Sequence, residues 1–107
     1  MAEPIDRLYG AILRARSADP AQSRTAKLLR EGVPKMSKKL VEEAAEVALD
    51  AVCGDRFHVV EESVDLIYNL TVLWAELGIA PGEVWAEMER RERTLGLAEK
   101  LPKLKGG

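Results

Sequence analysis

Residues 38–77 read KKLVEEAAEVALDAVCGDRFHVVEESVDLIYNLTVLWAEL. The dipeptide Gly54-Asp55 separates two helical patterns within this stretch. Before this dipeptide, from residue 35 to 53, apolar side chains recur at the spacing of one broad helical stripe. After it, a longer helical pattern runs from about residue 56 to 77 and ends before a glycine. Because Gly54 and Asp55 favour a turn over a helix, the stretch predicts two antiparallel helices that form a hairpin.

The rest of the chain also has helical patterns, and no stretch reads convincingly as a β-strand. Prolines and glycines mark the boundaries, because proline suits a first helical turn and glycine suits a helix end. The expected segments are a helix from Pro4, a second helix capped by Asp19 with Pro20 in its first turn and ending at Glu31-Gly32, a restart at Val33-Pro34, a last helix from Pro81 to about Arg93, and a tail over 96–107. We therefore predict a single all-α domain over residues 1–107, with four or five helices.

Composition and charge exclude several classes of function. The net charge is -2, from 16 basic and 18 acidic residues, so no overall field attracts nucleic acid. The N-terminus has no signal-peptide pattern, no apolar run reaches about 18 residues, and one cysteine allows no internal disulfide. We therefore expect a cytoplasmic protein without a membrane segment. A chain of 107 residues buries a modest share of its surface, so association with a second copy would stabilise it.

The first helix of the hairpin carries acidic side chains on one face. At about 100° per residue, four of them fall together opposite the apolar stripe: Glu42, Glu43, Glu46 and Asp50. Lys38 and Lys39 each stand four residues before a glutamate, a spacing that gives weak ion pairs on a helix surface. Taken alone, this face is typical of a solvated amphipathic helix.

The second helix of the hairpin changes that interpretation. It is apolar almost all round, which predicts burial on more than one side. Yet Glu62, Asp65 and Asn69 share one stripe of it. Because buried carboxylates are costly unless something compensates their charge, this stripe should face a wet cleft or hold a cation.

Hairpin geometry links the two acidic stripes. A turn at Gly54 brings residues at equal distance from it to one level, which pairs Glu46 with Glu62 and Glu43 with Asp65. Two glutamates whose spacings are off by one are possible substitutes: Glu42 and Glu61. Four clustered carboxylates repel one another, whereas a hard divalent ion makes the cluster favourable. Oxygen-only ligands with room for water indicate Mg²⁺ or Mn²⁺ in preference to zinc.

Basic side chains lie near these acids in the sequence, although each taken singly is typical of plain surface charge. The set consists of Arg24, Lys27, Lys35, Lys38, Lys39 and Arg56. Because Mg²⁺ held by a few carboxylates commonly binds substrate phosphates, the set predicts a phosphate clamp. The chemistry that follows is attack of an activated water on phosphorus, with pyrophosphate leaving and one carboxylate accepting the water's proton. His58 is expected to be a cap or surface residue, and Tyr68 is the aromatic residue that could line the cleft.

Residues 38–91, from KKLVEEAAE through EESVDLIYNL to VWAEMERR, closely resemble the phosphoribosyl-ATP pyrophosphatase family. This family supplies the second enzyme of histidine biosynthesis. It belongs to the all-α nucleoside triphosphate pyrophosphatase superfamily, which also holds the MazG-type enzymes. The EExxE and ExxD patterns carry the superfamily resemblance, and the KK pair, the GDR turn and VLWAELGI indicate the phosphoribosyl-ATP branch.

The resemblance implies Mg²⁺-dependent hydrolysis of phosphoribosyl-ATP to phosphoribosyl-AMP and pyrophosphate. It implies catalytic and metal-ligating roles for four residues: Glu43, Glu46, Glu62 and Asp65. The expected contacts to substrate are Glu42, Lys39, Arg56, Asn69 and Lys35. Family members are dimers or larger, so the resemblance also implies homodimerisation that completes the hairpin core into a four-helix-bundle-like arrangement.

The chain departs from the common family pattern at three places. Ser23-Arg24-Thr25 stands where many members have Ser-Tyr-Thr, Asn69 stands where many have histidine, and residues 91–103 extend beyond a minimal member. Two other hypotheses stay open at this point. One is a MazG-type house-cleaning nucleotide pyrophosphatase with the same metal chemistry and a different base pocket. The other is a non-catalytic helical dimerisation module that keeps the acidic residues as surface.

Overall fold

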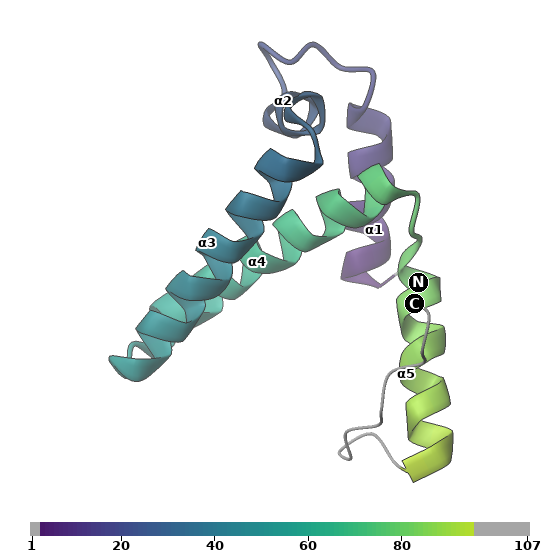
Figure 1. Cartoon of the computed structure of the whole chain (residues 1–107). Coiled ribbons are helices and arrows are strands. Elements are labelled where there is room, and N and C mark those ends of the chain that lie inside the picture. The colour runs from purple at the N-terminus through teal and green to yellow at the C-terminus, as the bar shows by residue number, and fades with distance from the viewer. Residues whose placement is uncertain (1–2, 96–107) are drawn as a thin grey trace.

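A computed structural model describes residues 3–95, and every regular element in that part of the chain is a helix (Figure 1). The helices are α1 (Pro4–Ala15), α2 (Arg24–Glu31), α3 (Val33–Val52), α4 (Arg56–Leu77) and α5 (Pro81–Leu95). The all-α prediction and the upper expectation of five helices are confirmed. The expected tail over 96–107 lies outside the described residues.

Helices α3 and α4 form the predicted hairpin and run side by side in opposite directions (Figure 1). The turn needs Gly54, whose φ of 74° lies in the left-handed region that favours glycine. Asp55 then caps α4, because its carboxylate accepts the backbone N–H of His58 at 3.1 Å. The same carboxylate contacts the imidazole ring of His58, so this histidine stabilises the helix start, as expected.

Helix α2 begins later than the sequence suggested. Its N-cap is Ser23, whose hydroxyl oxygen accepts the backbone N–H of Ala26 at 3.1 Å. Asp19 is not a helix cap: its carboxylate accepts the N–H of Ala21 at 2.9 Å within a turn. The prediction of a cap at Asp19 was wrong because aspartate followed by proline suits the start of a turn as well as a helix start.

The core is small and lies at one end of the hairpin, where α1 and α2 pack on the start of α3 and the second half of α4. Its buried apolar members are Ile12, Leu28, Met36, Val72 and Ala75. The first half of α4 is different, since Val60 is 65% exposed and Val64 is 63% exposed. Burial of α4 on more than one side, as the sequence predicted, therefore holds only for its second half in the single chain.

Helix α5 points away from the hairpin after a sharp bend (Figure 1). Gly78 ends α4 with a φ of 73°, and the axes of α4 and α5 then differ by 105°. Trp74 and Trp85 hold the two helices together through an edge-to-face contact, with ring centroids 6.1 Å apart. Within residues 3–95 no single helix is both long and apolar enough to cross a membrane, although α4 and α5 would pass on length and composition as a bent pair.

Candidate active site

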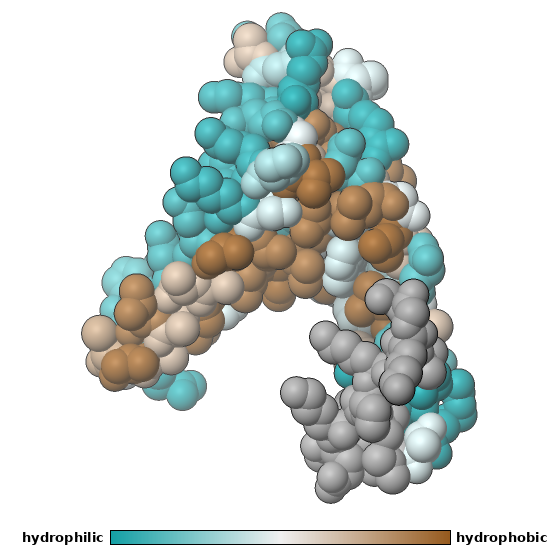
Figure 2. Space-filling model, in the orientation of Figure 1, coloured by the Kyte–Doolittle hydropathy of each residue, from teal (hydrophilic) through white to brown (hydrophobic). Residues whose placement is uncertain are grey.

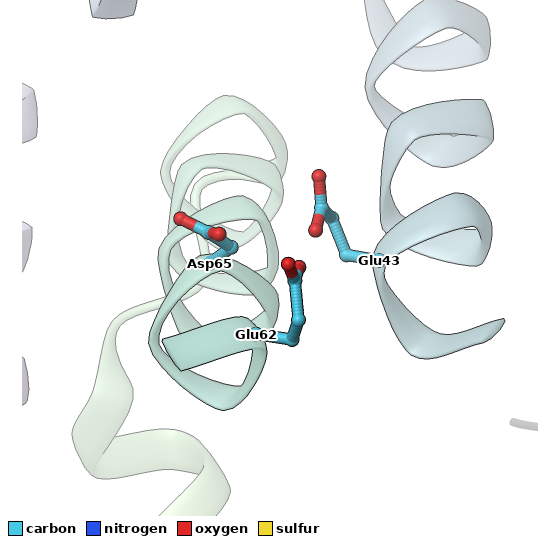
Figure 3. Close-up of side chains that lie close together, drawn as sticks. All are labelled: Glu43, Glu62 and Asp65. Carbon is cyan, nitrogen blue, oxygen red and sulfur yellow. The ribbon is translucent and has the colours of Figure 1, made fainter. Parts of the chain in front are cut away.

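Acidic side chains from both helices of the hairpin converge in the middle of its length. Glu43 reaches from α3 toward Glu62 and Asp65 on α4 (Figure 3). One carboxylate oxygen from each of these residues lies within 4.8 Å of the other two. This juxtaposition was predicted from equal distances to Gly54, and it makes the acidic stripes one cluster.

The fourth predicted acid, Glu46, joins this cluster through Glu62. A hydrogen bond with Glu62, together with the repulsion of its negative charge, raises the pKa of Glu46. The same hydrogen bond lowers the pKa of Glu62, but partial burial and the neighbouring Glu43 and Asp65 outweigh it and raise that pKa overall. Both shifts have one physical meaning: the cluster resists full ionisation unless positive charge is supplied.

The Glu43 carboxylate gives the clearest sign of where that positive charge would sit. Its Oε2 atom is buried and has no hydrogen-bond partner within the described part of the chain. A buried carboxylate oxygen without a partner is costly, and a bound cation removes that cost. The ligand atoms that the cluster of Glu43, Glu62 and Asp65 offers are all carboxylate oxygens, the ligand type that suits Mg²⁺ and Mn²⁺. The residues present therefore fit a hard divalent ion.

A hollow of about 320 Å³ opens beside Glu43 between α2, α3 and α4, and we call it the basic hollow. Its lining consists of Arg24, Lys27, Leu28, Glu31, Lys35, Lys39, Glu43, Tyr68 and Asn69. Four of these side chains are basic, and within the lining Glu31 pairs with Lys35 at 3.8 Å. A hollow with this excess of positive charge next to an acidic cluster suits a phosphate chain that a cation bridges.

Two hydrogen bonds fix the α4 side of this hollow. Asn69 is only 5% exposed, and its Nδ2 atom donates to the backbone carbonyl of Asp65 at 2.8 Å. The Tyr68 hydroxyl lies 2.6 Å from the Thr25 Oγ1 atom, which ties α4 to the start of α2. Asn69 and Tyr68 therefore line the cleft, and Tyr68 does so as the sequence suggested.

A second hollow, of about 580 Å³, lies on the other side of Asp65, and we call it the apolar hollow. It is lined by Pro4, Ile5, Leu8, Arg24, Thr25, Val64, Asp65, Ile67 and Tyr68. A site role for α1 was not predicted from the sequence. No local motif could have supplied one, because the hollow exists only where α1 packs across α4.

Some residues expected at the site lie outside these hollows. Arg56 lines a separate hollow at the hairpin turn, together with Gly54 and Val60. It stands six residues before Glu62, a rise of about 9 Å along the helix. Glu42 is exposed and lines neither hollow. Of the six basic residues of the predicted phosphate clamp, Lys38 and Arg56 do not line the basic hollow, whereas the other four do: Arg24, Lys27, Lys35 and Lys39.

An all-helical chain with clustered carboxylates between paired helices, beside a basic hollow, has the features of a hydrolase of phosphate anhydrides. The sequence profile of the phosphoribosyl-ATP pyrophosphohydrolase family matches residues 5–92. Phosphoribosyl-ATP pyrophosphatase 2 of Rhodopseudomonas palustris is 62% identical over 107 residues, which are 100% of this chain and 82% of that protein. The protein of the same name from Bradyrhizobium diazoefficiens is 61% identical over 103 residues, 96% of this chain and 77% of its own length. Phosphoribosyl-ATP pyrophosphatase of Azospirillum brasilense is 46% identical over 99 residues, which are 92% of this chain and 89% of that protein.

The chain belongs to the phosphoribosyl-ATP pyrophosphohydrolase family, and the resemblance carried by residues 38–91 is thereby confirmed.

Proposed function

We propose that this protein hydrolyses phosphoribosyl-ATP to phosphoribosyl-AMP and pyrophosphate, the second step of histidine biosynthesis. Membership of the family supports the substrate. The single observation that carries the chemistry is the position of Glu43: its carboxylate belongs to the acidic cluster and has an unpartnered Oε2 atom, and its side chain also lines the basic hollow. One residue thus connects the candidate cation site with the candidate phosphate site.

The residues that would hold the cation are Glu43, Glu46, Glu62 and Asp65, with Mg²⁺ as the expected ion and Mn²⁺ as a substitute. When bound, the ion would supply Lewis-acid chemistry to the phosphate oxygens and positive charge to the cluster. One carboxylate of the cluster would accept the proton of the attacking water.

The basic hollow would hold the pyrophosphate that leaves. Lys35 and Lys39 of α3 and Arg24 and Lys27 of α2 line it from two sides. Charge-assisted contacts from these groups stabilise the negative charge that grows on the leaving oxygen as the anhydride bond breaks. Substrate orientation then follows, because the phosphate that is attacked lies at the carboxylates and the two outer phosphates lie among the basic side chains.

The test is pyrophosphate release in the presence of Mg²⁺, with phosphoribosyl-ATP compared against the common NTPs and dNTPs. We expect hydrolysis of phosphoribosyl-ATP at a kcat/KM far above that for any other nucleotide. Hydrolysis of ordinary nucleotides without action on phosphoribosyl-ATP would refute the assignment and favour a MazG-type house-cleaning activity. Absence of hydrolysis on all of them would favour the non-catalytic module.

We also propose that the active form is a homodimer, with the hairpins of two copies forming a four-helix bundle. An exposed apolar strip supports it, made of Leu49, Val52, Phe57 and Val60 on the half of the hairpin nearer the turn. In Figure 2, brown hydrophobic residues lie on the surface at this end of the hairpin. Val52 is 87% exposed, and a strip of this kind is a common sign of a protein interface. A second copy is the occupant that suits it, because so short a chain has a small core of its own.

Sedimentation of the purified protein tests the dimer. Val60→Asp places a charge in the strip and should convert the dimer to monomer, with the helical circular dichroism retained. Leu77→Asp is the matched control, because Leu77 is 53% exposed on the same helix and lies outside the strip. A wild-type monomer at micromolar concentration, or an unchanged dimer in Val60→Asp, would contradict the proposal.

The cytoplasm is the compartment that we propose for this enzyme. Cys53 is the only cysteine in the sequence, and it lies exposed with a free thiol at the hairpin turn. An exposed thiol stays reduced in a reducing compartment such as the cytoplasm. Localisation of a tagged full-length chain by microscopy would test this directly.

A further inference from the structure

The two hollows meet at the acidic cluster. Glu43 lines the basic hollow and Asp65 lines the apolar hollow, yet an oxygen atom of each lies within 4.8 Å of the other. Arg24 and Tyr68 line both hollows and form their common wall. The carboxylates are therefore at a junction, with a charged space on one side and an apolar space on the other.

The linings of the two hollows differ in chemistry. The apolar hollow is formed mainly by aliphatic side chains, of which Val64 is 63% exposed and Ile67 is 41% exposed in the single chain. Its polar side chains are few: Arg24, Thr25, Asp65 and Tyr68, whose hydroxyl is paired with Thr25. Exposed aliphatic surface with a few polar groups at its margin is the usual composition of a small-molecule site.

The common wall is held in place. The Tyr68 hydroxyl and the Thr25 Oγ1 atom are 2.6 Å apart, so the phenol ring is fixed at its far end by α2. A fixed aromatic ring beside an apolar space offers a face on which a flat heterocycle can stack, and such stacking accepts any base.

Cleavage of a nucleoside triphosphate into a monophosphate and pyrophosphate needs this kind of asymmetry. On one side of the broken bond lie two highly charged phosphates, and on the other lie the α-phosphate, the ribose and a flat base, which in phosphoribosyl-ATP also carries a phosphoribosyl group. Resting on the proposed function, we infer that the apolar hollow is the nucleobase subsite, with the Tyr68 ring as its stacking wall. The substrate then lies across the junction, with its pyrophosphate end in the basic hollow and its base against α1.

A second copy of the chain is the other possible occupant. Two residues of the lining argue against it, because an apolar helix face packed there would bury Arg24 and Asp65 without polar partners. A nucleotide supplies those partners, since its ring nitrogens and ribose hydroxyls can pair with a guanidinium and a carboxylate. The exposed apolar strip at the turn half of the hairpin is available for a second copy.

A pair of tryptophan variants on α1 tests the subsite. Ile5→Trp fills the apolar hollow, and Leu13→Trp is the matched control, because Leu13 is 40% exposed on the same helix and lines no hollow described above. Calorimetry would measure binding of phosphoribosyl-AMP and of inorganic pyrophosphate, each with Mg²⁺. We expect Ile5→Trp to weaken phosphoribosyl-AMP binding by about tenfold or more and to leave pyrophosphate binding within about twofold of the control.

A second pair of variants tests the stacking wall without filling the hollow. Tyr68→Phe keeps the ring and removes the hydroxyl, whereas Tyr68→Leu removes the ring. Phosphoribosyl-AMP binding should fall by about tenfold or more in Tyr68→Leu and by less than about threefold in Tyr68→Phe. Equal losses in the two variants would overturn the stacking role.

Several outcomes would overturn the inference. Unchanged phosphoribosyl-AMP binding in both Ile5→Trp and Tyr68→Leu would place the base elsewhere, while continued wild-type hydrolysis of phosphoribosyl-ATP would leave the proposed function intact. Dissociation of a wild-type dimer by Ile5→Trp, with Leu13→Trp still dimeric, would assign the hollow to the second copy. If the wild-type enzyme hydrolyses another triphosphate instead, the same four variants are measured with the monophosphate of that nucleotide, so the two failures stay distinguishable.

Discussion

The two halves of α4 differ sharply in burial. In the second half, Thr71 and Val72 are fully buried and Ala75 is almost fully buried, and the helix packs against α1 and α2. In the first half, Val60 and Val64 are more than 60% exposed, and Glu62 and Asp65 carry the charge of the acidic cluster. Both halves are rich in apolar residues, so composition alone does not separate them.

This difference shows how one helix can serve stability at one end and function at the other. The second half has its packing partners within the same chain. The first half packs on α3 but leaves Val60 and Val64 exposed. Its charges and apolar side chains fit partners that come from outside: a divalent cation, a nucleotide and a second copy.

The largest expected effect is on turnover and belongs to the first half. Asp65→Asn or Glu46→Gln should lower kcat by at least about 100-fold, because each removes an ionised oxygen from the cluster. Pyrophosphate release measures it, and Glu89→Gln on the exposed face of α5 is the control. Both site variants should stay folded and dimeric, with a slightly higher unfolding temperature in metal-free buffer, since like-charge repulsion is relieved. Full activity in both would disprove the metal-site interpretation.

The next effect is on stability and belongs to the second half. Val72→Ala should lower the free energy of unfolding by about 2 kcal/mol, because Val72 is 0% exposed and the change leaves a cavity. Val60→Ala removes the same two methyl groups from a side chain that is 65% exposed. Chemical denaturation at low protein concentration should show an effect below about 0.5 kcal/mol for it. Equal losses in the two variants would mean that α4 is packed alike along its whole length.

The contrast between the halves also explains what could be predicted from the sequence. The cluster was predictable because Glu43, Glu62 and Asp65 are placed by their distance from a single turn, and helical geometry is regular over so short a span. The cap of α2 was not, because Asp19 and Ser23 carry similar signals and only tertiary packing selects one.

Contacts between distant segments were the least predictable part of the site. Arg56 was expected near the phosphates but lies at the hairpin turn. Arg24 lines the basic hollow as the predicted clamp required, but its place in the wall of the apolar hollow was not predicted. Proximity along one helix limits where a side chain can reach. The docking of α1 and α2 on the hairpin decides the rest, and it depends on packing that no local pattern encodes.

The smallest expected effect is on the pH dependence of stability. Interactions within the cluster raise the pKa of Glu46 and Glu62 above the ordinary value of 4.5, so the folded state binds these protons more tightly than the unfolded state. Their stabilising contribution is present below pH 4.5 and is lost as the pH rises through the folded-state pKa values. In α5, Arg90 and Arg91 lower the pKa of Glu87 to about 2 through hydrogen bonds, with the opposite sign. Its contribution is present above pH 4.5 and is lost as the pH falls toward 2.

Thermal unfolding of the metal-free protein between pH 2 and 8 separates the contribution of the acidic cluster from that of Glu87. In Glu62→Gln, the unfolding temperature should decrease less than in the wild type as the pH rises above 4.5. In Glu87→Gln, it should decrease less than in the wild type as the pH falls below 4.5. Added Mg²⁺ should raise the unfolding temperature of the wild type at neutral pH and have little effect on Glu62→Gln, because the cation stabilises the ionised cluster that this variant lacks. A Glu62→Gln profile that follows the wild type across the whole range, with and without Mg²⁺, would show that the exposed half of α4 carries no repulsion for a cation to relieve.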